Sequence, residues 1–347
     1  MLFYILNENF EKVAVIDTFI SAIWTDRYYT PGDFEIYTGA SAEALDQFRL
    51  GRYVLRGDDT SQAAIIEKVK LTTDAEEGDH ITITGRNVQA LLSRRIVWAQ
   101  STYIGKAEAA IRKLIERAMI SPDIAARTVP GFMLGTPAGL AEEVNAQFYG
   151  DDLGAAVQGI CKEAGIGYKI EFDATIPGFV FTIYKGSDRS SDQTDNPLVI
   201  FSPEFDNLLS TEYIKSSESF RNVAQVAGEG MGTAKQIVSV GTATGWSRFE
   251  TRVDGSNAST NSEEFSAATY AGMLEQQGRE ALAKLKNTEA MSGAVLQSQF
   301  KIGVDYFLGD IVETRSHYGQ SVKSRVTEVV ESWAEDGHTI LPTFAEI

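Results

Sequence analysis

Two segments about 260 residues apart in this chain follow the same pattern, and this duplication constrains the fold more than any other feature. The first copy covers residues 50–83 and the second covers residues 308–341. Each begins with Leu-Gly, continues through two stretches in which apolar and polar residues alternate, and crosses an acidic turn that ends in glycine. The two glycines are 27 residues apart in the first copy and 28 in the second. This alternation is typical of half-buried strands, so the chain is expected to carry two related β modules.

The duplication has a consequence for assembly. Three chains with two similar modules each can place six quasi-equivalent units on one ring. The alternative is convergence, because a glycine after an acidic turn is common in unrelated β-hairpins.

Composition sets the broad class. The chain has 347 residues, enough for two or three domains with a sizeable core. No apolar run is long enough to cross a bilayer, and residues 1–8 lack the basic start of a signal peptide, so we expect synthesis in a cytoplasm. The single cysteine, Cys161, excludes an intrachain disulfide and lies at helical spacing among apolar residues, which predicts a buried thiol.

The net charge of −17 argues against a surface that grips nucleic acid, because such surfaces neutralise phosphates with lysine and arginine. Two interpretations remain open. The protein has no contact with DNA, or it forms a wall past which DNA slides without binding.

The pattern along the chain predicts an α+β, β-rich fold. Residues 1–100 read as strands and turns with a short helical turn near 88–92, and aromatic residues gather between 19 and 34, where core and interface packing is the favoured interpretation. Residues 101–198 carry two amphipathic helices and two alternating strands. The second β module is expected over 199–253 and 295–347, with a polar loop and a long helix inserted at 254–294.

No constellation of residues supports catalysis or a bound cofactor. The glycine-rich run at 228–235 lacks the spacing of a phosphate-binding loop and is better explained as a turn between two strands. His80, His317 and His338 offer no pair at metal-ligand spacing. The carboxylates of the loop 186–195 lack the spacing of a calcium-binding EF-hand. The sequence therefore predicts a protein that is not an enzyme and has no cofactor and no metal site.

Several segments together resemble the baseplate hub or tail-tip hub proteins of bacteriophage tails, in particular the siphophage hub family. The middle of the chain carries most of this resemblance, with a GxDRS loop followed by FSxxFxNL at residues 186–190 and 201–208. The other similar segments are residues 24–35, 83–96, 184–209, 222–230, 308–312, 325–329 and 342–344.

The resemblance implies a homotrimer at the distal end of the tail tube. Each subunit would contribute two tube-like β-barrel domains, residues 1–100 and residues 199–253 with 295–347, to a pseudo-hexameric ring, with α+β domains inserted between them. Such a ring would adapt the sixfold tail to a threefold tip and let DNA pass. The residues expected at interfaces are Trp24, Tyr28, Tyr29 and Phe34, with Asp188, Arg189 and Gln193 ordering the middle loop.

The partners expected from the resemblance are a distal tail ring protein, the tail tube, the tape measure protein, and fibre, spike or receptor-binding proteins at the tip. The expected location is the virion, after synthesis in the host cytoplasm, without sequence-specific nucleic-acid binding or a membrane span. For Arg189, an internal ion pair with Asp188 or Asp192 is favoured over a contact with a partner. Two other functions stay open: a tail-associated cell-wall hydrolase, and the hub of a phage-like contractile injection particle.

Overall fold

The fold was analysed in a computed structural model of the chain. It describes residues 1–76, 78–208, 212–255, 267–292, 295–296, 299–335 and 337–347. Most of the polar loop expected at the start of the 254–294 insertion lies outside these ranges, as does residue 209 at the end of the similar segment 184–209.

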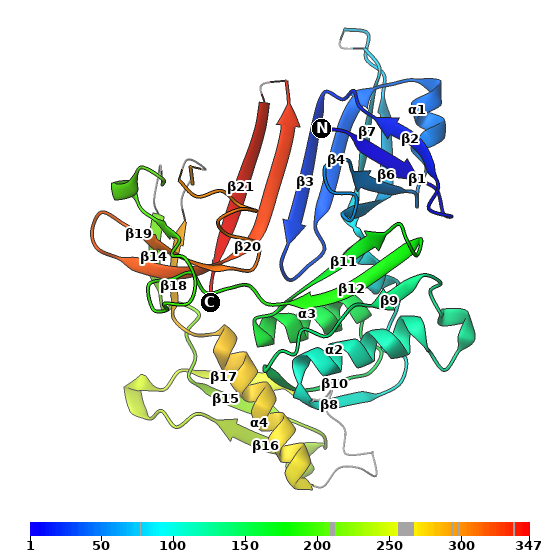
Figure 1. Ribbon diagram of the computed structural model, residues 1–347. Helices are drawn as coiled ribbons and strands as arrows, with labels where there is room; N and C mark the ends of the chain where they lie inside the picture. The colour runs from blue at the N-terminus through cyan, green and yellow to red at the C-terminus, as the bar shows by residue number, and fades with distance from the viewer. Residues whose placement is uncertain (77, 209–211, 256–266, 293–294, 297–298, 336) are drawn as a thin grey trace.

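A sheet of 11 strands joins the two ends of the chain (Figure 1). The amino-terminal region supplies seven of them: β1 (Phe3–Leu6), β2 (Lys12–Ile16), β3 (Ser21–Arg27), β4 (Asp33–Gly39), β5 (Tyr53–Arg56), β6 (Ala63–Thr72) and β7 (His80–Asn87). The carboxy-terminal region supplies β13 (Ile200–Phe201), β19 (Ile311–Arg315), β20 (Ser321–Ala334) and β21 (Gly337–Glu346). The strand order is β13-β19-β20-β3-β4-β7-β6-β5-β1-β2, and β21 pairs with β20. The predicted β-rich class is confirmed, while this sheet stays open within the described residues.

The duplicated segments fold into the same unit. Strands β5-β6-β7 and strands β19-β20-β21 are both antiparallel meanders. In the first, the N–H of Gly51 donates to the carbonyl of Ile66 at 2.8 Å; in the second, the N–H of Gly309 donates to the carbonyl of Val326 at 2.8 Å. Both glycines have a positive φ, +86° and +95°, which favours glycine over residues with a side chain.

A β-bulge also recurs at the equivalent place. The register between β6 and β7 shifts between Ile66 and Lys68, and the register between β20 and β21 shifts between Val326 and Glu328. A bulge inserts one residue and bends the strand, so it is a specific feature that convergent hairpins would not be expected to share. The two copies are therefore related modules rather than similar turns.

A hairpin extends each meander on the same side. In the amino-terminal region β3 pairs with β4, and β4 pairs with β7. In the carboxy-terminal region β14 (Glu212–Ser216) pairs with β18 (Thr288–Ser292), which contacts β20 and β21. Lys286, just before β18, donates to the carbonyl of Ile347, so β18 begins where β21 ends. We call β3–β7 the first module and β14 with β18–β21 the second module.

An α+β layer lies beneath the sheet (Figure 1). Its core holds the buried faces of the helices α2 (Ala107–Ile115) and α3 (Leu153–Ala164). Asp152 caps α3 by accepting from the N–H of Ala155 at 2.8 Å, and Gly165 ends the helix at φ +65°. Cys161 is fully buried on α3, as predicted. The remaining elements are the 3₁₀ helix 88–94, β8 (Ser101–Lys106), β9 (Phe132–Leu134), β10 (Glu143–Phe148), β11 (Gly167–Asp173) and β12 (Gly178–Tyr184).

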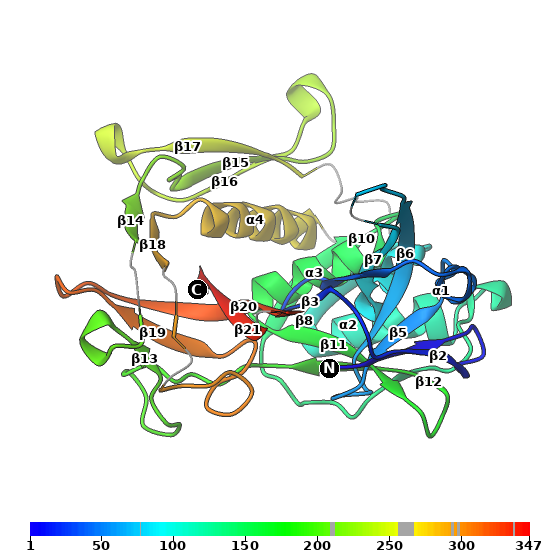
Figure 2. The same cartoon turned by 90° about the horizontal axis from the view of Figure 1, so that it is seen from above.

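A small sheet forms a separate unit with the long helix α4 (Ala267–Lys284), as Figure 2 shows. Its strands are β15 (Val223–Ala227), β16 (Ile237–Val240) and β17 (Glu250–Asp254). Tyr270, Met273 and Leu274 of α4 pack on Ala224 and Val226 of β15. The sequence grouped residues 199–253 with the second module, whereas these three strands pair with one another and the unit interrupts the β14–β18 hairpin. The described helices include none that could span a membrane.

Candidate functional site

The two modules meet edge to edge, where β20 runs antiparallel to β3. The pairing extends from Glu328 opposite Arg27 to Ala334 opposite Ser21. Beyond the strands, the N–H of Tyr28 donates to the carbonyl of Thr327 at 2.9 Å. The backbone ladder therefore joins the meander β19–β21 of the second module to the first module in one continuous sheet, while β14 and β18 pair as a separate two-stranded sheet.

Ion pairs cross this junction. Arg27 lies 2.5 Å from Glu328 and 2.6 Å from Asp33. Arg56, with a side chain only 5% exposed, bridges Asp58 at 2.8 Å and Glu331 at 2.7 Å. Burial by itself would lower the pKa of Arg56. The hydrogen bonds that Arg56 donates to Asp58 and Glu331 outweigh burial and raise the pKa. Arg56 therefore stays charged and ties the first module to β20.

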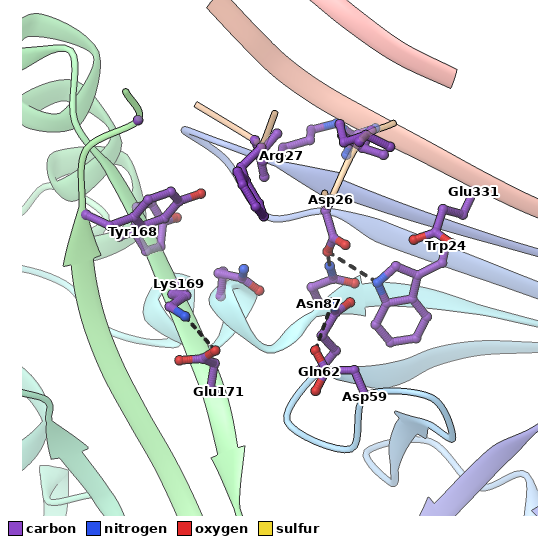
Figure 3. Close-up of a pocket in the computed structure, with 18 of the residues that line it drawn as sticks. Trp24, Asp26, Arg27, Asp59, Gln62, Asn87, Tyr168, Lys169, Glu171 and Glu331 are labelled. Carbon is purple, nitrogen blue, oxygen red and sulfur yellow. Dashed lines mark hydrogen bonds and ion pairs between the residues drawn. The ribbon is translucent and has the colours of Figure 1, made fainter. Parts of the chain in front are cut away.

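A cavity of about 620 Å³ opens beside the junction (Figure 3). Strands β3, β11, β12 and β20 and the loop before β19 contribute to its wall. Asp26 lies there between Trp24 and Asn87, whose side-chain N–H groups donate to it at 3.2 and 2.8 Å. Burial raises the pKa of Asp26 to about 6, although Arg56 acts against this rise. The carboxyl group therefore changes charge near neutral pH.

The cavity wall combines charged, polar and apolar side chains, and its described lining residues include no histidine and no cysteine. Its charged groups are mostly paired, for example Lys169 with Glu171 at 2.6 Å. Gln62, Asn87, Gln89 and Tyr168 each carry a buried oxygen without a partner among the described residues. Such neutral oxygens accept hydrogen bonds from hydroxyl or amide donors. Within the described ranges, no three His, Cys, Asp or Glu side chains converge on a point where a metal ion could bind.

Tyr28 lies where the first module, the second module and the α+β layer meet. Its ring packs on Tyr184 with the centroids 5.3 Å apart. Its hydroxyl donates to the carbonyl of Gly165 at 3.3 Å and accepts from the N–H of Gly186 at 3.3 Å. A carbon placed at the Cβ position of Gly309 would lie 2.2 Å from this ring, so glycine is required there. Burial raises the pKa of Tyr28 to about 12, and the phenol stays neutral.

The other aromatic residues that were expected at interfaces make their contacts inside one subunit. Trp24 and Phe34 are 1% and 2% exposed and pack with their rings tilted and the centroids 5.9 Å apart, while Tyr29 is half-buried against Tyr28. Trp24, Phe34 and Tyr28 therefore join parts of one subunit in the structure. A role for these four residues between subunits stays a prediction.

The middle loop is bound along β19. Arg189 forms an internal ion pair, but with Asp310 at 2.6 Å rather than with Asp188 or Asp192. Asp310 also accepts from the N–H of Ser187 at 2.7 Å. The partner is 121 residues away in sequence, so local spacing could not identify it.

The side chains of Asp188 and Gln193 bond within the loop. Asp188 accepts from the N–H of Ser190 at 2.8 Å. Gln193 donates to the carbonyls of Ser190 and Asn196, both at 3.1 Å, and accepts from the N–H of Asn196 at 2.7 Å. These bonds lie within the loop, and the role of Asp188 and Gln193 in ordering it stays a prediction.

Sequence reasoning missed the polar residues of the junction. Arg56 and Glu331 are 275 residues apart, and no local pattern connects them. Asp26 carried a signal, because strand alternation places it on the same face as the buried Trp24. A carboxylate on a buried face is unusual and could have been singled out.

The fold is similar to that of several solved phage and prophage tail proteins. The tail protein from Neisseria meningitidis MC58 aligns at 12% identity with a TM-score of 0.57, covering 99% of this chain and 96% of that chain. The 43 kDa tail protein of prophage MuSo2 from Shewanella oneidensis aligns at 13% identity with a TM-score of 0.58, covering 100% and 98%. Prophage tail protein gp18 from Listeria monocytogenes EGD-e aligns at 9% identity with a TM-score of 0.56, covering 99% and 94%.

The chain therefore shares its fold with these tail proteins. The sequence matches the Siphovirus ReqiPepy6 Gp37-like protein family over residues 2–344, and the chain belongs to this family. The resemblance to a siphophage tail family seen in the sequence is confirmed. Among curated proteins, none matches the chain.

Proposed function

We propose that this chain is a structural hub of a siphophage tail tip. Three copies would form a ring of six modules that adapts the sixfold tail tube to a threefold tip and lets DNA pass. In this proposal residues 1–100, and residues 199–253 with 295–347 apart from the separate sheet of β15–β17, supply the two tube-like β-barrel domains. Residues 101–198 form the α+β domain between them and 254–294 form the loop and helix insertion. The family membership supports the siphovirus setting.

The observation that carries the proposal is the joining of two related modules through β20 and β3. The modules share the order of their meander strands, their bulge and their positive-φ glycine, and the meander of the second module pairs with the edge of the first in one sheet. When one such contact is repeated head to tail, it generates a ring if the rotation closes. A ring of six modules from three chains follows if each step turns by about 60°.

The proposed partners are the distal tail ring protein, the tail tube and the tape measure protein on one side. Fibre, spike or receptor-binding proteins are the proposed partners on the other, and the proposed location is the virion, after synthesis in the host cytoplasm. The net charge of −17 supports a wall that DNA passes without binding. In this role the chain needs no catalytic cycle and no cofactor.

The test is native mass spectrometry and electron microscopy of the purified chain over a range of concentrations. We expect a trimer and a ring with three masses. A monomer at the highest concentration would overturn the proposed function. Clearing of cell wall in a zymogram by the same preparation would overturn the non-enzymatic assignment.

A further inference from the structure

Each module has two strand edges that matter for assembly, and of these four edges the described strands pair one edge of β20 with one edge of β3. In β20, residues 321–325 pair with β19, and residues 328–334 continue past the end of β19 and pair with β3. In β6, residues 63–65 pair with β5, and residues 68–72 likewise continue past the end of β5. Among the described strands, none pairs with that continuing edge of β6.

The complementary edge is repeated as well. The outer edge of β3, opposite β4, is the one that receives β20. By position in its module, β14 corresponds to β3, because it forms the outer strand of the hairpin that lies beside β21. Within the described part of the sheet, the outer edge of β14 has no strand partner. Figures 1 and 2 place β14 and β6 on opposite sides of the molecule, so the two edges cannot pair within one chain.

We infer that β6 of one subunit pairs antiparallel with β14 of the next, by the same contact that joins β20 to β3 inside each chain. This inference rests on the proposed ring and names the surface that closes it. The partner is a second copy of this chain, because the unpaired edges of β6 and β14 correspond to the edges of β20 and β3 that pair inside each chain. The interface is head to tail, so each subunit gives β6 to one neighbour and β14 to the other.

The internal junction also predicts the register. The shared bulge aligns Glu328 with Lys68, so Val330 corresponds to Lys70 and Ser332 to Thr72. The hairpins β3–β4 and β14–β18 each contain five residue pairs. The pair next to the connecting loop contains Thr25 in β3–β4 and Ser216 in β14–β18. Since Val330 pairs with Thr25, Lys70 is expected opposite Ser216. Two positions further along, Thr72 is expected opposite Ile214.

The exposure of both edges fits this contact. Leu71 on β6 and Ile214 on β14 are each 47% exposed in the single chain. Unpaired strand edges with exposed apolar residues invite pairing with another chain, and native proteins usually protect them. Pairing between subunits would satisfy both edges at once.

Cysteine pairs test the interface directly, because the only native thiol, Cys161, is buried. The matched pairs are Lys70→Cys with Ser216→Cys, and Thr72→Cys with Ile214→Cys, each introduced into the same chain. Directly opposite positions in antiparallel strands lie within disulfide range. The control pair, Lys70→Cys with Glu212→Cys, is displaced by four residues, or about 13 Å along the strand. We expect covalent dimers and trimers from the matched pairs after mild oxidation, and at least tenfold less from the control.

A second variant provides a readout that does not depend on oxidation. Ile214→Asp places a charge at the proposed interface, while Ile237→Asp places one on β16 at a residue that is 56% exposed. We expect the first variant to weaken trimer formation at least tenfold and the second to leave it unchanged. A trimer that forms without crosslinks from either matched pair, or that is unaffected by Ile214→Asp, would overturn this interface and leave the proposed function standing. A chain that never forms a trimer would overturn both.

Discussion

The two modules share a backbone plan and differ in what surrounds it. Gly51 and Gly309 occupy the same place, with the same hydrogen bond and a positive φ. A Cβ at Gly51 would meet nothing within 4 Å, whereas one at Gly309 would meet the ring of Tyr28. The duplication therefore accounts for the strands that the modules share. The junction within the chain places a further packing requirement on the second copy, at Gly309.

The β3–β4 and β14–β18 hairpins also differ in what surrounds their shared strands. The β3–β4 hairpin closes through residues 28–32, whereas the β14–β18 hairpin contains residues 217–287 between its strands. That insertion brings its own sheet and helix, with a small core of its own. Loops tolerate such additions because closing a longer loop costs only slightly more entropy. The frame common to the modules is thus confined to the strands and the bulge.

We expect the largest difference in the free energy of unfolding between alanine substitutions at the two glycines. Gly309→Ala forces a methyl group against Tyr28 and strains a positive φ, so we expect a loss of about 3–5 kcal/mol in the free energy of unfolding. Gly51→Ala carries only the backbone strain, and we expect a loss of about 1 kcal/mol. Denaturant unfolding of both variants measures the difference. Equal losses would mean that Tyr28 does not hold the junction as described.

We expect a smaller difference in the free energy of unfolding between substitutions in two ion pairs, one at the junction and one on the surface. Arg56→Ala removes the buried guanidinium that bonds Asp58 and Glu331 and leaves the half-buried Glu331 with His338 at 3.2 Å, and we expect a loss of about 2–3 kcal/mol. Arg86→Ala removes a more exposed pair with Glu67 on the first module, and we expect less than about 1 kcal/mol. Unfolding of both variants at low and high salt is the measurement. A junction that tolerates Arg56→Ala as well as the surface change would contradict the role given to Arg56.

The smallest expected effect depends on pH. The pKa of Asp26 is about 6 in the folded chain and near its ordinary value of 3.8 when unfolded. Between these values the folded chain holds a proton that the unfolded chain has released, so the free energy of unfolding falls as pH rises through this window.

Asp26→Asn removes this penalty, and we expect it to stabilise the chain by about 1–2 kcal/mol at pH 8 and by little at pH 4. Unfolding curves at both pH values provide the measurement, and Asp79→Asn at an exposed turn is the control. A gain that is the same at both pH values would rule out titration of Asp26 as the cause.

Much of the backbone could be predicted from the sequence. The duplicated segments, the two amphipathic helices within residues 101–198 and the buried Cys161 all follow from local patterns that the structure contains. The resemblance to a tail family, carried by short motifs, also held over nearly the whole chain.

What the sequence could not supply were contacts between distant residues. Arg189 was expected to pair within its own loop, and the structure pairs it with Asp310, which also bonds the backbone of Ser187. Nor did alternation reveal which strands share a sheet, so β15–β17 were grouped with the second module instead of with α4. Both differences arise because pairing across the fold depends on chain topology, which local periodicity does not contain.

The shared bulge bears on the shape of the wall that these strands build. A bulge bends its strand and increases the local twist. Glu67 and Thr327 are the inserted residues, and each follows directly after the residue whose carbonyl accepts from the glycine N–H of its module, so β6 and β20 bend at the same place relative to that hydrogen bond. Each module therefore sets its own curvature, and a surface made from alternating modules would curve evenly although its two kinds of unit differ in almost every side chain.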